Sequence, residues 1–244
     1  TATTEIYTPS LHDALPISGL GTNVPLSKLN GGRPFVLLDA CEETPTVDAV
    51  NFPNEEAERA AMQHLIDRGC RNIAIVGHRF APRADLAHAQ NAFALRLRGA
   101  CGALSDAGLP YDESMVFEAG DVANGIIAGH AIAERILAAR SGHGGTEFDG
   151  ACCANDFAAF GVIRGLADRG LRVPQDVKVI GFDGVTSGSY TTPALSTIQV
   201  DFTQLAKFSV DMLSERIDHG TDEALPPRRA IIGYQLVDRE STAV

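Results

Sequence analysis

Residues 151–183 contain two short apolar runs, each followed by a polar residue, with a helical segment between them. The first run leads into Asn155, and the second leads to Asp183. Residues 157–169 have the spacing of a helix that Asp156 can cap. In an open α/β sheet, ligands bind beyond the carboxyl ends of the strands. We therefore predict that Asn155 and Asp183 lie at a ligand site; the alternative is that Asn155 only ends a strand and Asp183 only opens a turn.

The same alternation of strands and helices extends along most of the chain. Strands are predicted at residues 34–40, 49–52, 72–77, 115–118, 148–154, 177–183, 195–199 and 230–237. Further helices are predicted at residues 54–67, with Asn54 as the cap, and at 92–107, 126–140 and 202–217. This order predicts an α/β fold of parallel sheets whose two faces are covered by helices.

Three stretches of the chain carry a resemblance to a known family. They are N-D-x-x-A-x-G…G-x-x-V-P-x-D-x-x-V-I-G-F-D at residues 155–183, R-G-C-R-N-I-A-I at residues 68–75 and L-V-D-R-E-S-T at residues 236–242. Together they resemble the effector-binding region of the lac/gal repressor family of bacterial transcription regulators, over residues 34–243. The resemblance implies a periplasmic-binding-protein-like fold with two doubly wound parallel-sheet lobes and a ligand cleft between them.

The resemblance also predicts how the chain divides. Residues 54–199 correspond to a whole second lobe, whereas residues 19–53 and 200–244 correspond to a remnant of the first lobe. Residues 1–18 have no helical or strand period, and they resemble the translation of a sequencing adapter. We therefore interpret residues 1–18 as a non-native leader. On this interpretation the natural protein begins before Gly19, with further strand–helix units of an otherwise incomplete first lobe.

The resemblance implies the residues of an effector site, and their chemistry suits a sugar. Sugar hydroxyl groups pair with carboxylates, amides and arginine, and the C–H faces of a sugar ring need apolar contacts. The residues that match the family's pocket are the acid Asp183, the amide Asn155, the arginine Arg96 in R-L-R-G, the first-lobe acid Asp39, and the apolar residues Phe52 and Phe202 at the lobe crossings.

Some assignments within this predicted site stay open. Arg98 rather than Arg96 is the alternative arginine to face the ligand, and either Phe52 or Phe202 can instead belong to the core. Val122 stands where some sugar-responsive relatives carry an aromatic stacking residue. The sequence therefore does not identify the effector, nor whether the effector releases DNA or promotes its binding.

Three classes of function compete for a chain of this kind. They are the effector-binding domain of a transcription regulator, a sugar-binding protein of a transport system, and an enzyme on a doubly wound sheet. The run G-L-G-T-N-V at residues 19–24 lacks the last glycine of a dinucleotide-binding motif, and neither a P-loop nor G-x-S-x-G is present. We therefore predict no enzyme and no cofactor. The R-E-S-T ending favours the regulator over the transport protein.

Charge and cysteine usage restrict the partners and the compartment. The net charge is −11 and the basic residues are scattered, so these residues do not predict a DNA-binding surface. By resemblance, DNA contact belongs to a missing N-terminal helix-turn-helix in a homodimer. The five cysteines form no C-x-x-C and predict reduced thiols of a cytoplasmic protein. The seven histidines lack metal-ligand spacing, and no apolar run is long enough to span a membrane.

Overall fold

The computed structural model describes residues 15–18, 34–41, 47–78, 81–118, 125–140, 148–219 and 225–243. The chain divides into two compact units, and each is described by itself. Unit 1 comprises Thr1–Phe52 and Asp201–Ile232, and unit 2 comprises Pro53–Val200 and Gly233–Val244.

Unit 2 is built on a six-stranded sheet with the strand order β10-β8-β7-β6-β4-β5. All neighbouring strands are parallel except β10, which pairs antiparallel with β8. The strand bounds are β4 (Ile73–Val76), β5 (Val116–Phe117), β6 (Gly150–Cys153), β7 (Lys178–Asp183), β8 (Ser196–Val200) and β10 (Tyr234–Val237). The predicted parallel α/β architecture is therefore confirmed.

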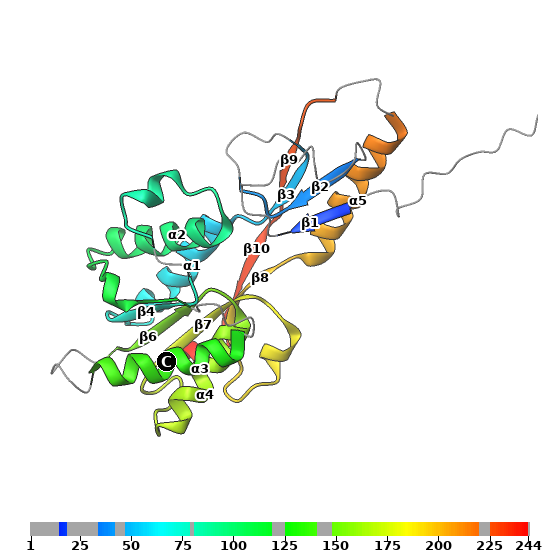
Figure 1. Cartoon of the computed structure of the whole chain (residues 1–244). Helices are drawn as coiled ribbons and strands as arrows, with labels where there is room; N and C mark the ends of the chain where they lie inside the picture. Colours follow the sequence, from blue (N-terminus) through cyan, green and yellow to red (C-terminus); the bar gives the residue numbers. More distant parts are fainter. Residues whose placement is uncertain are drawn as a thin grey trace, which may run out of the picture. The chain divides into compact units, whose positions relative to one another are not determined.

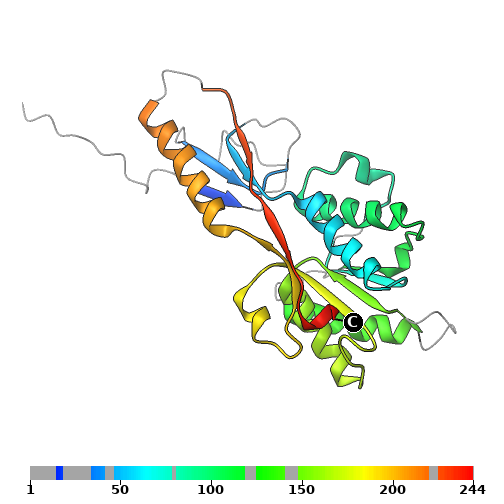
Figure 2. The same ribbon diagram turned by 180° about the vertical axis from the view of Figure 1, so that it is seen from behind.

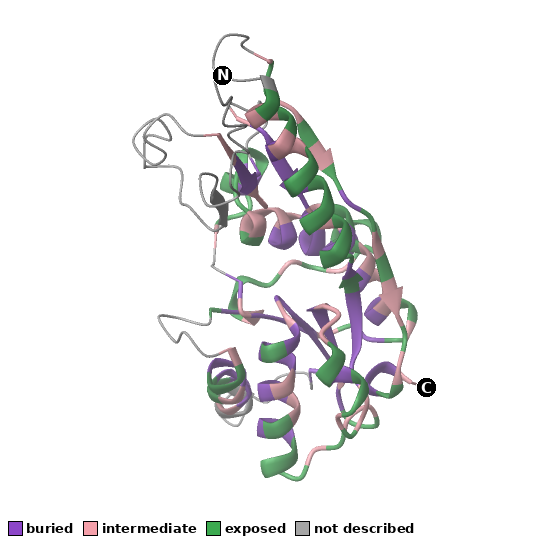
Figure 3. Ribbon diagram, turned by 90° about the vertical axis from the view of Figure 1, so that its right-hand side faces the viewer, coloured by how far each residue is buried: buried purple, intermediate pink, exposed green. Residues whose placement is uncertain are grey.

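Helices cover both faces of this sheet. The helix α1 lies with α2 on one face, and α3 lies with α4 on the other (Figures 1 and 2). Their bounds are α1 (Asn54–Asp67), α2 (Ala92–Asp106), α3 (Gly125–Arg140) and α4 (Asp156–Asp168); single turns η3 (Asp85–His88), η4 (Glu113–Met115), η5 (Thr186–Ser189) and η6 (Glu240–Thr242) join the longer elements. Every residue of β4 and β6 is buried, as expected for parallel strands enclosed by two helical layers (Figure 3).

The core of unit 2 is an apolar cluster that joins the sheet to α3 and α4. Its largest members are Phe117, Phe148, Ile132, Ile136 and Leu166, each at most 6% exposed. Burial of such side chains contributes about 1.5–3 kcal/mol each. This packing makes the sheet rigid, so the residues that directly follow its strands have fixed positions.

Unit 1 is built on a four-stranded parallel sheet with the strand order β1-β2-β3-β9. The elements are β1 (Leu15–Ser18), β2 (Phe35–Leu38), β3 (Ala49–Asn51), β9 (Arg229–Ile231) and the helix α5 (Phe202–His219). The helix packs on the sheet through a cluster that contains Val36, Val50, Leu213 and Ile232 (Figure 1).

A buried carboxylate ties α5 to the strands of unit 1. Asp48, directly before β3, accepts hydrogen bonds from Arg216 Nε at 2.9 Å and Arg216 Nη2 at 2.8 Å. It also accepts from the backbone N–H of Arg228, directly before β9, at 2.8 Å. Burial alone raises the pKa of Asp48, but these hydrogen bonds outweigh burial and hold the pKa below its usual value. The ion cluster therefore fixes three segments of unit 1 to one another.

The structure corrects the prediction of one continuous strand over residues 230–237. β9 ends at Ile231 in the sheet of unit 1, and β10 begins at Tyr234 in the sheet of unit 2. Residues 233–244 accordingly belong to unit 2, although the sequence analysis assigns all of residues 200–244 to the first lobe. The apolar pattern alone does not record which sheet a strand joins, and Gly233 separates the two strands.

The part of residues 1–18 that the structure describes also differs from expectation. Leu15–Ser18 form β1 and pair with β2 in parallel register. The prediction that residues 1–18 contain no strand is therefore wrong for these four residues. A proline can stand in a strand at the edge of a sheet. The non-native origin of the leader and the incompleteness of the first lobe stay predictions.

Two helix caps are also corrected. Asn155, not Asp156, is the N-cap of α4, and its Oδ1 accepts from the backbone N–H of Ala158 at 2.8 Å. Asn54 is the first residue of α1, and the cap position is Pro53. The two side chains predicted as caps, Asp156 and Asn54, make other contacts, which are described in the next section.

Candidate functional site

Two predicted site residues follow neighbouring strands of unit 2. Asn155 comes two residues after β6, and Asp183 ends β7, which pairs with β6 in parallel register. Carboxyl ends of parallel strands meet at one edge of a sheet, so both side chains stand at the same edge. The oxygen of the Asn155 side chain serves α4, which leaves its NH2 group as the donor for a ligand. Asp183 is half-buried and supplies a carboxylate.

Arg96 connects the ends of these two strands. Its Nη1 donates to the backbone oxygen of Ala154 at 2.6 Å, and its Cζ lies 3.6 Å from the centre of the Phe182 ring. Ala154 directly precedes Asn155, and Phe182 directly precedes Asp183. The guanidinium is therefore fixed against the residue that precedes each predicted ligand residue, with only 7% of Arg96 exposed.

The first residue of α1 completes the support of Arg96. Asn54 Oδ1 accepts from Arg96 Nε at 2.7 Å, and Asn54 is buried. This hydrogen bond holds the oxygen of the Asn54 side chain against Arg96. It also needs α1 and α2 to lie close together, and Gly99 of the R-L-R-G motif provides that approach: a Cβ there would overlap the backbone oxygen of Glu55.

Arg98 is directed to a different set of partners. Its Nη2 pairs with Glu55 Oε2 at 2.5 Å, and its Nη1 donates to the backbone oxygens of Leu86 at 3.2 Å and Ala87 at 3.3 Å. These contacts tie α2 to α1 and η3. Of the two arginines that the sequence left open, the geometry favours Arg96 at the edge that carries Asn155 and Asp183.

Asp156, which the sequence predicts as a helix cap, has a different role in the structure. Its carboxylate is buried beneath the turn after β7, where Oδ2 accepts from the backbone N–H of Val185 at 2.7 Å and Oδ1 accepts from Thr197 Oγ1 at 2.6 Å. The signal available in the sequence was Gly181, two residues before Asp183. A Cβ at Gly181 would overlap Asp156 Oδ1, so the carboxylate occupies the space that this glycine leaves.

A second buried polar cluster, also missed, lies between α1 and the sheet. Glu58 and His78 are both 0% exposed, and His78 Nε2 lies 3.1 Å from Glu58 Oε1. The thiol of Cys152 donates to the same oxygen at 3.3 Å, and the His78 ring stands edge-on to Phe93. Glu58 is one turn from Asn54 on α1, and Phe93 is three residues before Arg96 on α2. The cluster therefore lies next to the support of Arg96.

The predicted site residues of unit 1 also come together. The backbone N–H of Phe52 donates to Asp39 Oδ1 at 3.3 Å, and the Phe52 and Phe202 rings meet edge-to-face with centres 5.6 Å apart. Asp39, at the end of β2, has φ +55°, and Phe202 is 50% exposed. Unit 1 thus presents an acid and an exposed aromatic ring in one cluster. The alternative of a core residue does not fit the exposed Phe202, whereas Phe52 is partly buried and packs against the apolar cluster of unit 1.

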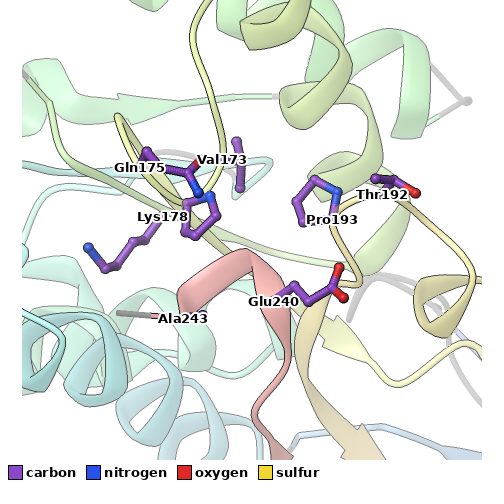
Figure 4. A pocket seen from close by; sticks show the side chains of 8 residues that line it. Val173, Gln175, Lys178, Thr192, Pro193, Glu240 and Ala243 are labelled. Carbon is purple, nitrogen blue, oxygen red and sulfur yellow. The ribbon is translucent and has the colours of Figure 1, made fainter.

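A cavity of about 600 Å³ opens elsewhere on unit 2 (Figure 4). Lys178, the first residue of β7, and Glu240 of η6 contribute its charged groups, and Val173, Pro174, Gln175, Thr192, Pro193 and Ala243 line the rest. Asp183 is the last residue of β7, so the cavity lies at the opposite end of this strand. It contains none of the predicted site residues.

The described residues contain no group of three or more His, Cys, Asp or Glu side chains arranged to hold a metal ion. All five cysteines are buried, and burial raises the pKa of the Cys70 and Cys101 thiols to about 11. Among the helices described, none combines the length and apolarity needed to cross a bilayer. Val122 and residues 19–24, which the sequence analysis discussed, lie outside the described residues.

Comparisons with known proteins identify the family to which this fold belongs. Residues 62–242 match the family model of the periplasmic binding protein-like domain. The HTH-type transcriptional repressor PurR of Aliivibrio fischeri (strain MJ11) is 30% identical over 192 residues, which are 79% of this chain and 53% of that repressor. The chain thus spans about half the length of the curated relatives it matches.

Solved structures define the family more closely. A LacI-type transcription regulator from Bifidobacterium animalis subsp. lactis superposes with a TM-score of 0.80 at 31% identity, over 95% of this chain and 80% of that one. The transcriptional regulator CelR in complex with cellobiose gives a TM-score of 0.79 at 27% identity, over 94% and 65%. The fold and the family model define a periplasmic-binding-protein-like domain, and the chain belongs to the LacI family of transcription regulators. It corresponds to the effector-binding region of such a regulator rather than to a transport protein.

Proposed function

We propose that this chain senses a sugar and that Arg96, Asn155 and Asp183 bind it. The observation that carries the proposal is the position of Arg96, whose guanidinium lies on Phe182 and on the backbone of Ala154. A fixed guanidinium, an amide NH2 group and a carboxylate form a donor and acceptor set that suits vicinal hydroxyl groups. The cellobiose complex of the similar regulator supports a sugar as the ligand class.

We propose further that Asp39, Phe52 and Phe202 of unit 1 also contact the effector. The Asp39 carboxylate accepts hydrogen bonds from hydroxyl groups, and the exposed Phe202 ring suits the C–H face of a sugar. An effector that binds one arrangement of the two units better than another shifts the population by that difference in affinity. This shift is the signal that the domain passes on, without catalysis.

For the whole protein we propose a cytoplasmic homodimeric regulator with a separate helix-turn-helix for DNA. The support is the LacI-family relationship, in which the relatives are transcription regulators. The net charge of −11 disfavours duplex binding by these residues, which supports the placing of DNA contact in the separate helix-turn-helix.

The site assignment predicts which variants lose effector binding. Arg96→Ala removes a hydrogen-bond donor, and Asp183→Asn removes the charge of an acceptor. Each change leaves a hydroxyl group of the bound sugar without its partner. That loss is about 1–3 kcal/mol, or about 5- to 150-fold in affinity. Isothermal titration of the chain with cellobiose, ribose, glucose and galactose identifies the sugar that wild type binds and then measures both variants.

Arg98→Ala is the matched control, because its guanidinium pairs with Glu55 away from the strand ends. We expect this variant to keep wild-type sugar affinity. Circular dichroism confirms that each variant is folded. Unchanged affinity in both Arg96→Ala and Asp183→Asn overturns the site assignment, and no binding of any of the four sugars by wild type argues against this ligand class.

A further inference from the structure

We propose that Asp156 is a positioning residue of the effector site, whose carboxylate holds the backbone that carries Asp183. The inference rests on the proposed function of Asp183 and adds the residue that orients it. Asp156 does not face a ligand, since it is 0% exposed. It acts on the effector only through the turn that follows β7.

The contacts of Asp156 join three segments of unit 2. Its own segment is the first turn of α4, its Oδ1 accepts from Thr197 Oγ1 on β8 at 2.6 Å, and its Oδ2 accepts from the N–H of Val185 at 2.7 Å. The backbone N–H of Gly184 is a further donor to this carboxylate. One side chain therefore holds both residues that directly follow Asp183.

The turn needs such support because its backbone is strained. Asp183 has φ +110°, a region that non-glycine residues rarely adopt, and Gly184 follows with φ +76°. A residue keeps such a conformation only where its surroundings fix it. Gln199 packs so closely on Gly184 that a Cβ there would overlap it, which bounds the turn from the other side. The hydrogen bonds that the backbone N–H groups of Val185 and Gly184 donate to Asp156 hold the turn in this conformation.

The charge state of Asp156 controls how many donors it can accept. Burial raises the pKa of Asp156 to about 6, although the bonds from Thr197, Val185 and Gly184 and the Arg239 guanidinium favour the charged form. The other titratable group that faces it is the thiol of Cys153, which burial keeps protonated. Above about pH 6 the carboxylate accepts from all its donors; below it, one oxygen carries a proton and the turn loosens.

The stability of the fold and the order of the turn respond to pH in opposite directions. Because the pKa of Asp156 is raised in the folded chain, its titration stabilises the fold fully below the ordinary value of 3.8, and that contribution is lost as pH rises through about 6. The ordered turn exists above about pH 6, where the buried charge costs stability.

Amide NMR of the ¹⁵N-labelled chain tests the support of the turn without any ligand. We expect the N–H signals of Gly184 and Val185 to titrate with a midpoint near pH 6, together with the backbone signals of Asp183. Asp156→Asn should abolish this midpoint. The control Asp168→Asn, at the exposed end of the same helix, should leave it unchanged. Absence of the midpoint in wild type, or its persistence in Asp156→Asn, overturns the proposal.

Binding of the sugar identified in the titrations tests the consequence for Asp183. We expect wild-type affinity to fall as pH drops through 6, and Asp156→Asn to bind at least tenfold more weakly at pH 7.5 with no further change over that window. Thr197→Val should weaken binding, and Thr197→Ser, which keeps the hydroxyl, should weaken it less. Wild-type affinity in Asp156→Asn refutes the positioning role. If no sugar binds wild type, the proposed function fails, while the amide titration still decides whether Asp156 holds the turn.

Discussion

The Glu58→Ala variant is expected to lose about 3–5 kcal/mol of unfolding free energy, the loss typical of breaking a buried pair. Glu58 and His78 are fully buried, and Glu58 Oε1 meets both His78 Nε2 and the Cys152 thiol. Removal of the carboxyl group leaves these two polar groups without that partner and opens a cavity beside the sheet. Urea unfolding at pH 7, followed by circular dichroism, measures the change.

Two further variants separate the pair from a general effect of mutating α1. Glu56→Ala changes an exposed glutamate of the same helix and should shift the unfolding free energy by less than about 0.5 kcal/mol. The double variant Glu58→Leu/His78→Leu replaces the pair with apolar side chains and should recover most of the loss. If Glu58→Ala costs no more than Glu56→Ala, the buried pair does not exist in solution.

The location of this pair gives it a second consequence. Asn54 and Glu58 lie one turn apart on α1, and Phe93 and Arg96 lie three residues apart on α2. The Glu58–His78 contact and the Asn54–Arg96 hydrogen bond are therefore consecutive contacts along the same layer. Loss of the first contact loosens the helices that hold Arg96, so Glu58→Ala should also weaken sugar binding.

The fold was largely predictable because its helices and strands follow local patterns. The helix predicted to follow the Asn54 cap and end at Asp67 spans Asn54–Asp67, and most other elements differ from expectation by one to three residues. The strand predicted at residues 230–237 failed for a non-local reason. Ile231 and Tyr234 belong to different sheets, and the choice of sheet depends on the partners β3 and β8, not on the apolar pattern of the strand itself.

The candidate site was predictable only where position along a strand determines it. Asn155 and Asp183 follow strands, so their common edge could be inferred from the chain alone. The choice between Arg96 and Arg98 needed the packing of α2, because both arginines lie on one helix and only its contacts show which faces Phe182. Asp156 was taken for a cap because a carboxylate at a helix start usually serves that role.

The buried groups show a further limit of sequence analysis. Two other glutamates, Glu55 and Glu56, precede Glu58 in the same helix, and nothing in the sequence distinguishes the buried glutamate from them. The partner that explains it, His78, is 20 residues away and meets it only when α1 packs on the sheet. Polar groups of this kind are paired by tertiary packing, so local patterns cannot reveal them.

Gly99→Ala is expected to destabilise the chain by about 3 kcal/mol, near the upper end of the usual cost of overpacking. A Cβ at position 99 would overlap the backbone oxygen of Glu55 and stand 3.0 Å from the backbone nitrogen of Arg59. Backbone atoms of α1 cannot move aside alone, so the two helices must separate. Thermal and urea unfolding measure the loss of stability.

Gly102→Ala, three residues further along the same helix, is the matched control. Its Cβ would approach only the guanidinium of Arg59, which is partly exposed and can swing away. The gain in helix propensity is about 1 kcal/mol, so this variant should be neutral or slightly stabilised. Equal effects of the two substitutions would mean that α1 and α2 are not in backbone contact. Separation of the helices also draws Arg96 away from Asn54, so Gly99→Ala, unlike Gly102→Ala, should weaken sugar binding even at temperatures where it is folded.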